Sequence, residues 1–272
     1  MISRTTATLL ATLAALLAVV VPAQADAATR SVSSSNWAGY AVSKPAVRFR
    51  RVASTWVQPA ASCAAGPRRY SAYWLGLGGF HSSSNALEQI GTQVDCSSIG
   101  EAVYSAWYEL VPAGPVHIAL AVRPGDTISA SAAVSGHSVK LYIANRTTGA
   151  IFSRRVHANH IDVTSAEWVV EAPSTCDLIG CEPLPLANFG SASFTGATAT
   201  TTAGHSGVIA DPAWATTAIT LSPSADRGVG TDLNLPGSSA RATPGDLSAG
   251  GDGFTVTYQD APPPAPGPPP VG

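Results

Sequence analysis

The chain reads Thr-Ile-Ser-Ala-Ser-Ala-Ala-Val from Thr127 to Val134, passes Ser135-Gly136-His137, and continues Val-Lys-Leu-Tyr-Ile from Val139 to Ile143. Period-2 alternation of apolar and polar residues over such short segments is typical of half-buried strands. The Ser-Gly-His segment between them carries a turn signal. We therefore expect two strands joined by a short turn.

The same pattern extends along most of the chain. Residues 116–122 and 254–258 alternate in the same way, and turn signals follow at residues 123–126 and 145–149. Several short strands with regular turns predict an all-β fold, a sandwich or a barrel. Residues 222–252 are rich in Gly, Ser, Pro and Asp and predict a long loop with weak strands. The Pro-rich residues 261–272 predict an extended, disordered tail.

The first 25 residues have the pattern of a secretory signal peptide. Met1 to Arg4 is short and positive, Leu9 to Val21 is apolar, and Ala23-Gln24-Ala25 supplies a cleavage site. The apolar run is shorter than the roughly 20 residues of a membrane-spanning helix. We expect a secreted, extracellular protein with no membrane anchor after cleavage. A short lead at residues 26–33 would precede one domain at residues 34–260.

Composition and motif searches exclude several function classes. Only 12% of the chain is charged and its net charge is −2, so a basic face for nucleic acid is not expected. The sequence has no G-x-S-x-G, H-E-x-x-H, P-loop or G-x-G-x-x-G motif. His157 and His160 could share a metal, but no Cys or carboxylate motif supports them. We expect no metal, no cofactor, no nucleic-acid partner and a monomer.

The four cysteines are Cys63, Cys96, Cys176 and Cys181. An even number in an exported chain predicts disulfides. The short loop from Cys176 to Cys181 closes easily through its Gly, which pairs Cys63 with Cys96. The alternative, a metal site, lacks C-x-x-C spacing and an accompanying His cluster.

One segment, Ser-Ala-Glu-Trp-Val-Val-Glu at residues 165–171, carries two carboxylates on a strand-like pattern. Side chains two apart share a face of a strand, so Glu167, Val169 and Glu171 lie together. The pair could perform acid–base chemistry, or it could belong to a solvated strand face. Composition alone leaves both readings open.

Five motifs, taken in order, resemble those of the glutamic peptidases (family G1, the eqolisins, formerly peptidase A4). The resemblance covers about Ser34 to Phe194. Its motifs are Asn36-Trp37-Ala38-Gly39, Tyr73-Trp74-Leu75-Gly76-Leu77-Gly78-Gly79, Leu87-Glu88-Gln89-Ile90-Gly91, Trp107-Tyr108-Glu109 and Ala166-Glu167-Trp168-Val169-Val170-Glu171.

The resemblance implies an antiparallel β-sandwich of two large sheets, like that of lectins and glucanases, with a concave substrate cleft. It assigns catalysis to Gln89 and Glu171. Trp37, Trp74 and Glu109 match substrate-binding positions in the cleft, which Glu167 would share.

The implied activity is a secreted endopeptidase that cleaves proteins or peptides at acid pH. Glu171 would take a proton from water and return it to the leaving amine, while the Gln89 amide would stabilise the oxyanion. Because the base must be ionised while neighbouring acids are protonated, we expect maximal activity below about pH 5.

Two positions depart from the fungal family pattern. Gly78 stands where fungal members have Asp, and the cleft acid after the catalytic Gln matches either Gln93 or Asp95. Both departures concern subsite charge and leave cleavage preference open.

Two other functions fit the residues less well. A glycosidase would use paired carboxylates at defined spacing, and the Glu167/Glu171 segment lacks the intervening Asp of the related glucanases. A non-catalytic module could grip a polymer with exposed Trp side chains, because fold does not fix function.

Overall fold

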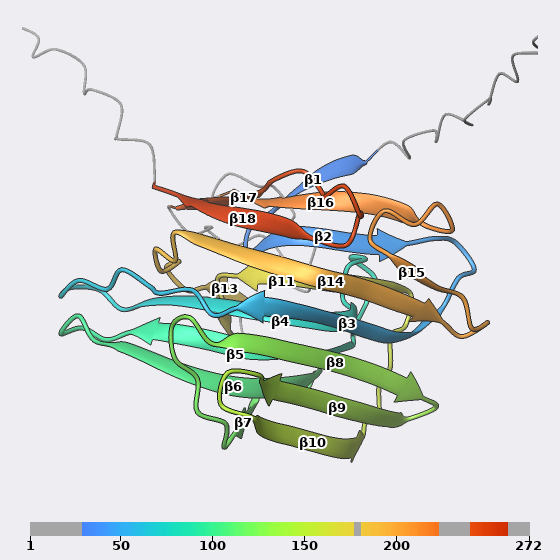
Figure 1. The fold of residues 1–272 in the computed structure, drawn as a ribbon, viewed down its shortest axis with the longest axis horizontal. Helices are drawn as coiled ribbons and strands as arrows, with labels where there is room; N and C mark the ends of the chain where they lie inside the picture. Colours follow the sequence, from blue (N-terminus) through green and yellow to red (C-terminus); the bar gives the residue numbers. More distant parts are fainter. Residues whose placement is uncertain (1–28, 177–180, 223–239, 261–272) are drawn as a thin grey trace, which may run out of the picture.

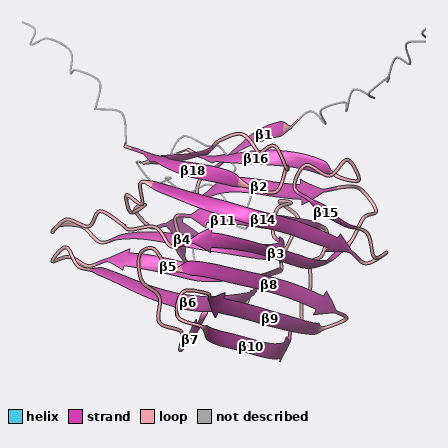
Figure 2. Cartoon of the chain, viewed as in Figure 1, coloured by secondary structure: helices cyan, strands magenta, loops and turns pink. Residues whose placement is uncertain are grey.

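The structure is a computed structural model that describes residues 29–176, 181–222 and 240–260. Every regular element in these ranges is a β-strand, as Figures 1 and 2 show. The expected signal peptide (1–25) and Pro-rich tail (261–272) lie outside the described residues. No helix among the described residues is long and apolar enough to cross a membrane. The predicted all-β class is confirmed.

The strands form two layers. The first layer, in hydrogen-bonded order, contains β10 (Ala150–His157), β9 (Ser138–Asn145), β8 (Thr127–Ser135), β3 (Phe49–Val57), β14 (Ser191–Thr201), β18 (Phe254–Gln259) and β17 (Arg241–Pro244). The second layer contains β16 (Ala215–Leu221), β2 (Trp37–Ser43), β11 (Ser165–Glu171), β4 (Arg69–Gly78), β5 (Leu87–Cys96), β6 (Ala102–Val111) and β7 (Val116–Ile118).

The two layers are not separate sheets. β17 pairs with β18 on one side and with β16 on the other, so one hydrogen-bonded sheet runs through both layers. The expected two large sheets are therefore continuous, and the layers face each other because this single sheet turns back on itself. β3 and β8 of the first layer contact β4 and β5 of the second.

Four short strands lie off this path. β1 (Arg30–Ser34) pairs with β16 in parallel, and β15 (Ser206–Val208) pairs with β14. β12 (Ser174–Cys176) and β13 (Cys181–Pro183) form a separate two-stranded sheet. The expected lead at residues 26–33 thus includes a strand of the main sheet.

Most of the strand predictions are confirmed. β8 and β9 pair antiparallel from Ile128↔Asn145 to Ser135↔Ser138, which is the predicted hairpin. The strand expected at residues 116–122 ends at Ile118, where the Leu120 amide turns back to donate to the Ile118 carbonyl at 2.8 Å. Within the loop expected at 222–252, β17 forms a strand and residues 223–239 lie outside the described residues.

Buried indoles tie the layers together across the core. Trp168 on β11 donates to the Ala53 carbonyl of β3 at 3.1 Å, and Trp56 on β3 donates to Thr92 Oγ1 of β5 at 3.0 Å. A buried polar group left without a partner costs about 1–3 kcal/mol, so these bonds fix how the layers face each other. They hold β11 and β5, which carry the candidate catalytic residues, on a rigid support.

Candidate active site

The candidate residues lie on the face of the second layer that points away from the core, called here the Trp74 face. Side chains alternate between the two faces of a strand. Ala166, Trp168 and Val170 of β11 belong to the main core. The opposite face carries a second buried apolar cluster made of Trp37, Ala41, Ala72, Trp74, Leu87, Trp107, Val169 and Ile219.

Strand register arranges this face in rows that run across β11, β4, β5 and β6. The first row contains Glu167, Gly76, Gln89 and Glu109. The second row contains Val169, Trp74, Gly91 and Trp107. The third row contains Glu171, Ala72, Gln93 and Ser105. All six predicted catalytic and substrate-binding residues lie on this face, since Trp37 is paired with Glu171 across β2 and β11.

Glu171 is a hydrogen-bonded carboxylate at the end of β11. Trp74 Nε1 donates to its Oε2 at 2.7 Å, and Asn36 Nδ2 donates to its Oε1 at 3.2 Å. Ser34 Oγ donates in turn to Asn36 Oδ1 at 3.1 Å, which fixes the orientation of the Asn36 amide. Both donors favour the ionised carboxylate, which can act as a proton acceptor.

Gln89 is held from the opposite side, by Glu109. Its Nε2 donates to Glu109 Oε2 at 2.7 Å, and its buried Oε1 has no hydrogen-bond partner among the described residues. An amide carries two N–H hydrogens, and Glu109 accepts one of them. The Gln89 amide thus has a fixed orientation and one N–H left to donate. The residue is almost fully buried, with 4% of its surface exposed.

Aromatic rings pack around these groups. Trp37 and Trp74 meet edge to face with ring centroids 5.0 Å apart. Gly91 lies between Trp74 and Trp107 in the second row, and a Cβ there would collide with the Tyr73 carbonyl and the Trp74 Cβ. Glycine is therefore required at this position so that β4 and β5 can bring the two indoles into one row.

Glu167 lies in the first row but is fully buried, with 0% of its surface exposed. Burial raises the pKa of Glu167 well above its ordinary value; the nearby Ser165 hydroxyl opposes this rise, and the charges of Asp162 and Glu88 add to it. A neutral, buried Glu167 presents no surface to a substrate. Its predicted binding role would have to be exerted through its neighbours.

The two candidates for the cleft acid after Gln89 are bonded to each other. Gln93 and Asp95 both lie on the Trp74 face of β5, and Gln93 Nε2 donates to Asp95 Oδ1 at 3.0 Å. Gln93 shares the third row with Glu171, whereas Asp95 lies one row further on. Gln93 is thus the nearer of the two to Glu171 in register.

Asp162, which the motifs did not single out, fills the space beside Gly78. A Cβ built on Gly78 would lie 2.6 Å from Asp162 Cβ and 2.9 Å from its carboxyl carbon. Asp162 accepts hydrogen bonds from Ser84 Oγ and from the Thr164 amide. A carboxylate therefore reaches the place of the missing Asp side chain from the loop before β11.

Asn36, Glu88 and Asp162 are functional candidates that sequence reasoning missed. Asn36 begins the Asn-Trp-Ala-Gly motif, and its position next to Trp37 is the one sequence feature that could have indicated a role in the site. Glu88 directly precedes Gln89, but no local sequence pattern shows that Glu88 and Asp162 lie close to each other in the fold.

The predicted Cys63–Cys96 disulfide is present, with a Cα–Cα distance of 5.3 Å. Cys176 and Cys181 pair across β12 and β13 in the backbone, but the side chain of Cys176 lies outside the described part of the chain. The second disulfide stays a prediction.

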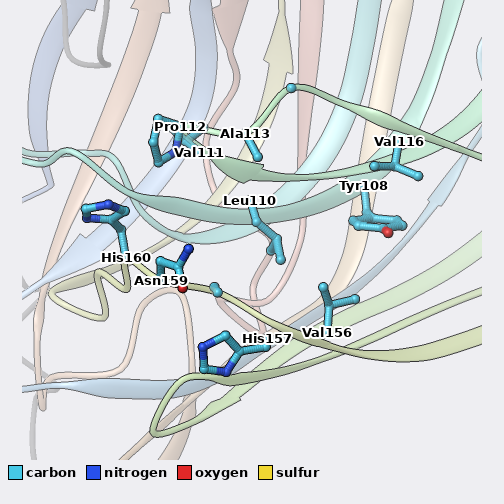
Figure 3. Close-up of a pocket in the computed structure, with 12 residues that line it drawn as sticks. Tyr108, Leu110, Val111, Pro112, Ala113, Val116, Val156, His157, Asn159 and His160 are labelled. Atoms are coloured by element: carbon cyan, nitrogen blue, oxygen red, sulfur yellow. The ribbon is translucent and has the colours of Figure 1, made fainter.

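The histidine pair lies in a different place. Figure 3 shows the groove that His157 and His160 line together with Tyr108 and Leu110 of β6. These two β6 residues alternate with Glu109 and so project from the opposite face of the strand. Among the described residues no group of three or more His, Cys, Asp or Glu side chains could hold a metal ion.

Comparisons with known proteins agree on one family. The model of the peptidase A4 family matches residues 35–240. Among solved structures, scytalido-glutamic peptidase with a peptide-based transition state analog is 23% identical, covers 82% of this chain and 98% of its own, and has a TM-score of 0.58. Aspergilloglutamic peptidase from Aspergillus niger is 27% identical, covers 70% of this chain and 99% of its own, and has a TM-score of 0.50.

A third solved structure, the eqolisin SCP-B in a complex with the tripeptide Ala-Ile-His, is 23% identical over 82% of this chain and 98% of its own, with a TM-score of 0.54. A search of the curated proteins finds no match.

Proposed function

The chain belongs to the peptidase A4 family, the glutamic peptidases, and from that premise we propose that it is an exported endopeptidase in which Glu171 and Gln89 hydrolyse peptide bonds at acid pH. The observation that carries the proposal is the Glu171 carboxylate, oriented by the Trp74 indole and the Asn36 amide. Its protein or peptide substrates fit the peptide-based inhibitor and tripeptide bound by two structural relatives.

In the proposed reaction, ionised Glu171 takes a proton from a water molecule, whose oxygen attacks the scissile carbonyl carbon. The Gln89 amide donates to the oxyanion of the tetrahedral intermediate. Glu171 then returns the proton to the amide nitrogen as the C–N bond breaks. Water is consumed, two peptide fragments leave, and Glu171 is ionised again.

The surroundings of the two residues support these roles. The Gln89 amide is oriented by Glu109, so its donor is arranged before substrate binds. Glu171 stands two rows away from Gln89 in register, with the Trp74 ring between their rows. A scissile carbonyl would lie between the two side chains, and Trp74, itself 0% exposed, would act through its hydrogen bond to Glu171.

Export is supported by the disulfide between Cys63 and Cys96, since such bonds persist in oxidising compartments. The comparisons do not support the glycosidase or the non-catalytic module. The family model that matches describes peptidases, and the structural relatives cited above are glutamic peptidases.

The test is hydrolysis of acid-denatured haemoglobin at about pH 3–4, where carboxylates titrate, by the wild type and by Glu171→Gln. We expect the variant to lose kcat by about 10³-fold or more with an unchanged melting temperature. Glu101→Gln is the matched control, because Glu101 is exposed and precedes β6, outside the three rows of the candidate site. Full activity of Glu171→Gln would refute the assignment, and inhibition of the wild type by a chelator would indicate metal-dependent chemistry.

A further inference from the structure

Three acids lie close together at one end of the candidate site. Glu167 belongs to the first row of the Trp74 face, whereas Glu88, next to Gln89, projects from the opposite face of β5. Glu88 comes from β5, Glu167 from β11, and Asp162 from the loop that leads into β11. The Asp162 amide donates to Glu88 Oε1 at 3.4 Å, and Glu167 lies within electrostatic range of both other carboxyls. Three acids from three segments thus meet at one end of β4, where Gly78 makes room for Asp162.

Glu88 and Glu167 are placed where a charge would be very costly. Both are 0% exposed, and Glu88 Oε2 and both carboxyl oxygens of Glu167 have no hydrogen-bond partner among the described residues. Neither forms a salt bridge within that part of the chain, in which the His205–Asp211 pair is the one found. Glu88 thus keeps only the long bond from the Asp162 amide. An ionised carboxylate buried with so few donors costs far more than a neutral one, so the geometry favours the protonated form of both acids.

The electrostatic surroundings agree with this preference. Burial raises the pKa of Glu88 to about 9, although the bond from the Asp162 amide opposes the rise and the Asp162 charge adds to it. Burial alone would also raise the pKa of Asp162, but bonds from Ser84, Thr164 and Gly79 lower it below its ordinary value. Asp162 is therefore the ionised member and Glu88 and Glu167 are the neutral ones.

The neutral acids sit on the two strands that carry the proposed catalytic pair. Glu88 directly precedes Gln89, Glu167 lies four residues before Glu171, and β4 is the one strand between them. We propose that Glu88 and Glu167 are positioning residues, which as neutral acids allow β5 and β11 to hold Gln89 and Glu171 in place, and whose ionisation disables the site as the pH rises. This inference rests on the proposed function for its catalytic consequence.

Burial is the main reason why ionisation is costly, and like-charge repulsion with no compensating cation adds to it. Glu88 is paired in register with Leu77 of β4 and Leu110 of β6, and Glu167 with Gly76 of β4 and Ala41 of β2. None of these neighbours ionises, so the titratable groups that act on the pair are Asp162 and the two acids themselves. If both acids ionise, two buried charges on the two faces of the sheet lie within electrostatic range of each other and of Asp162.

The first experiment measures the unfolding equilibrium constant by urea denaturation between pH 5 and pH 7, and it does not depend on peptidase activity. An acid that is ionised in the unfolded chain but protonated in the folded protein raises the unfolding constant about tenfold per pH unit. Between pH 5 and pH 7, the increase in the unfolding constant should therefore be about 100-fold smaller in Glu88→Gln than in the wild type, and likewise in Glu167→Gln. The double variant should reduce it about 10⁴-fold, and Glu101→Gln should leave it unchanged.

The second experiment links the acids to the site. Wild type and Glu88→Gln are incubated for one hour at pH values from 4 to 10 and assayed on haemoglobin at about pH 4, near the carboxylate range. The neutral isostere should keep the activity seen before incubation and should move the midpoint of alkaline inactivation upward by about one pH unit or more. Glu88→Leu should also raise the midpoint of alkaline inactivation, because leucine cannot ionise and the negative charge is what inactivates the protein.

The proposal would be overturned if the unfolding constant rose equally with pH in the wild type, in Glu88→Gln, in Glu167→Gln and in the double variant. The two acids would then not be neutral in the folded protein. Altered slopes with an unshifted inactivation midpoint would overturn the positioning role. If the wild type cleaves no protein at all, the proposed function fails, while the unfolding slopes still decide the protonation of the pair.

Discussion

Trp74 Nε1 donates a 2.7 Å hydrogen bond to Glu171 Oε2, joining the second and third rows of the Trp74 face. A phenylalanine at this position would keep an aromatic ring but would lack the indole N–H. Hydrogen bonds to charged groups contribute about 1.5–3 kcal/mol. Trp74 is therefore more than a packed ring in this face, because its N–H orients the proposed base.

Trp74→Phe should lower kcat about 10- to 100-fold, as the loss of a charge-assisted hydrogen bond predicts. Steady-state hydrolysis of a fluorogenic peptide at about pH 4 measures the effect. Trp107→Phe is the matched control, because its buried Nε1 has no partner among the described residues. An equal loss in both variants would show that the indole N–H of Trp74 has no special role.

Gly78→Ala should destabilise the fold more than Gly125→Ala does. Both glycines have positive φ, 81° and 87°, which costs a non-glycine residue about 1–2 kcal/mol. A Cβ on Gly125 meets nothing within 4 Å, whereas one on Gly78 meets the Cβ and carbonyl oxygen of Asp162 at 2.6 Å. Urea denaturation should give a loss of about 1–2 kcal/mol for Gly125→Ala and clearly more for Gly78→Ala. Equal losses would mean that the Asp162 loop moves aside freely.

Ser84→Ala should destabilise the protein more above about pH 4 than at lower pH, because only the bond to Asp162 depends on pH, unlike those with the Gly79 amide and the Ala86 carbonyl. The Ser84 bond helps to lower the pKa of Asp162 in the folded state, so its contribution is present above the unfolded pKa and is lost as pH falls through the folded one. The expected loss at pH 6 is about 1.5–3 kcal/mol.

Denaturation curves at pH 6 and pH 2.5 measure this difference, and Ser83→Ala, at an exposed position in the same loop, is the control. A loss of the same size at both pH values would assign Ser84 to loop packing instead of carboxylate binding.

Replacing Cys63 and Cys96 together with serine should lower the free energy of unfolding by about 3–4 kcal/mol, from the chain entropy of a loop with a sequence separation of 33 residues. Calorimetry under non-reducing conditions measures the change. A melting temperature equal to that of the wild type would show that the β5 end is held without this bridge.

Local pattern was sufficient for most of the strands and for the shared face of the two glutamates in β11. The alternation in residues 127–145 predicts the β8–β9 hairpin because side-chain direction on a strand is a local property. For the same reason Glu167 and Glu171 share a face, and the resemblance to the peptidase family added Gln89, Trp37, Trp74 and Glu109. The even cysteine count and the short loop from Cys176 to Cys181 likewise predicted the Cys63–Cys96 bridge.

The tertiary structure alone decided which of these groups meet and which are charged. Register across β11, β4, β5 and β6 places Gln89 in the row of Glu167 and not in that of Glu171, and it depends on pairings between segments far apart in sequence. Burial, which is a property of the packed layers, makes Glu167 a neutral acid although its spacing from Glu171 suggests a second active carboxylate. The Asp162 loop and the continuity of the sheet through β17 follow from the same long-range packing, for which a single sequence holds no local signal.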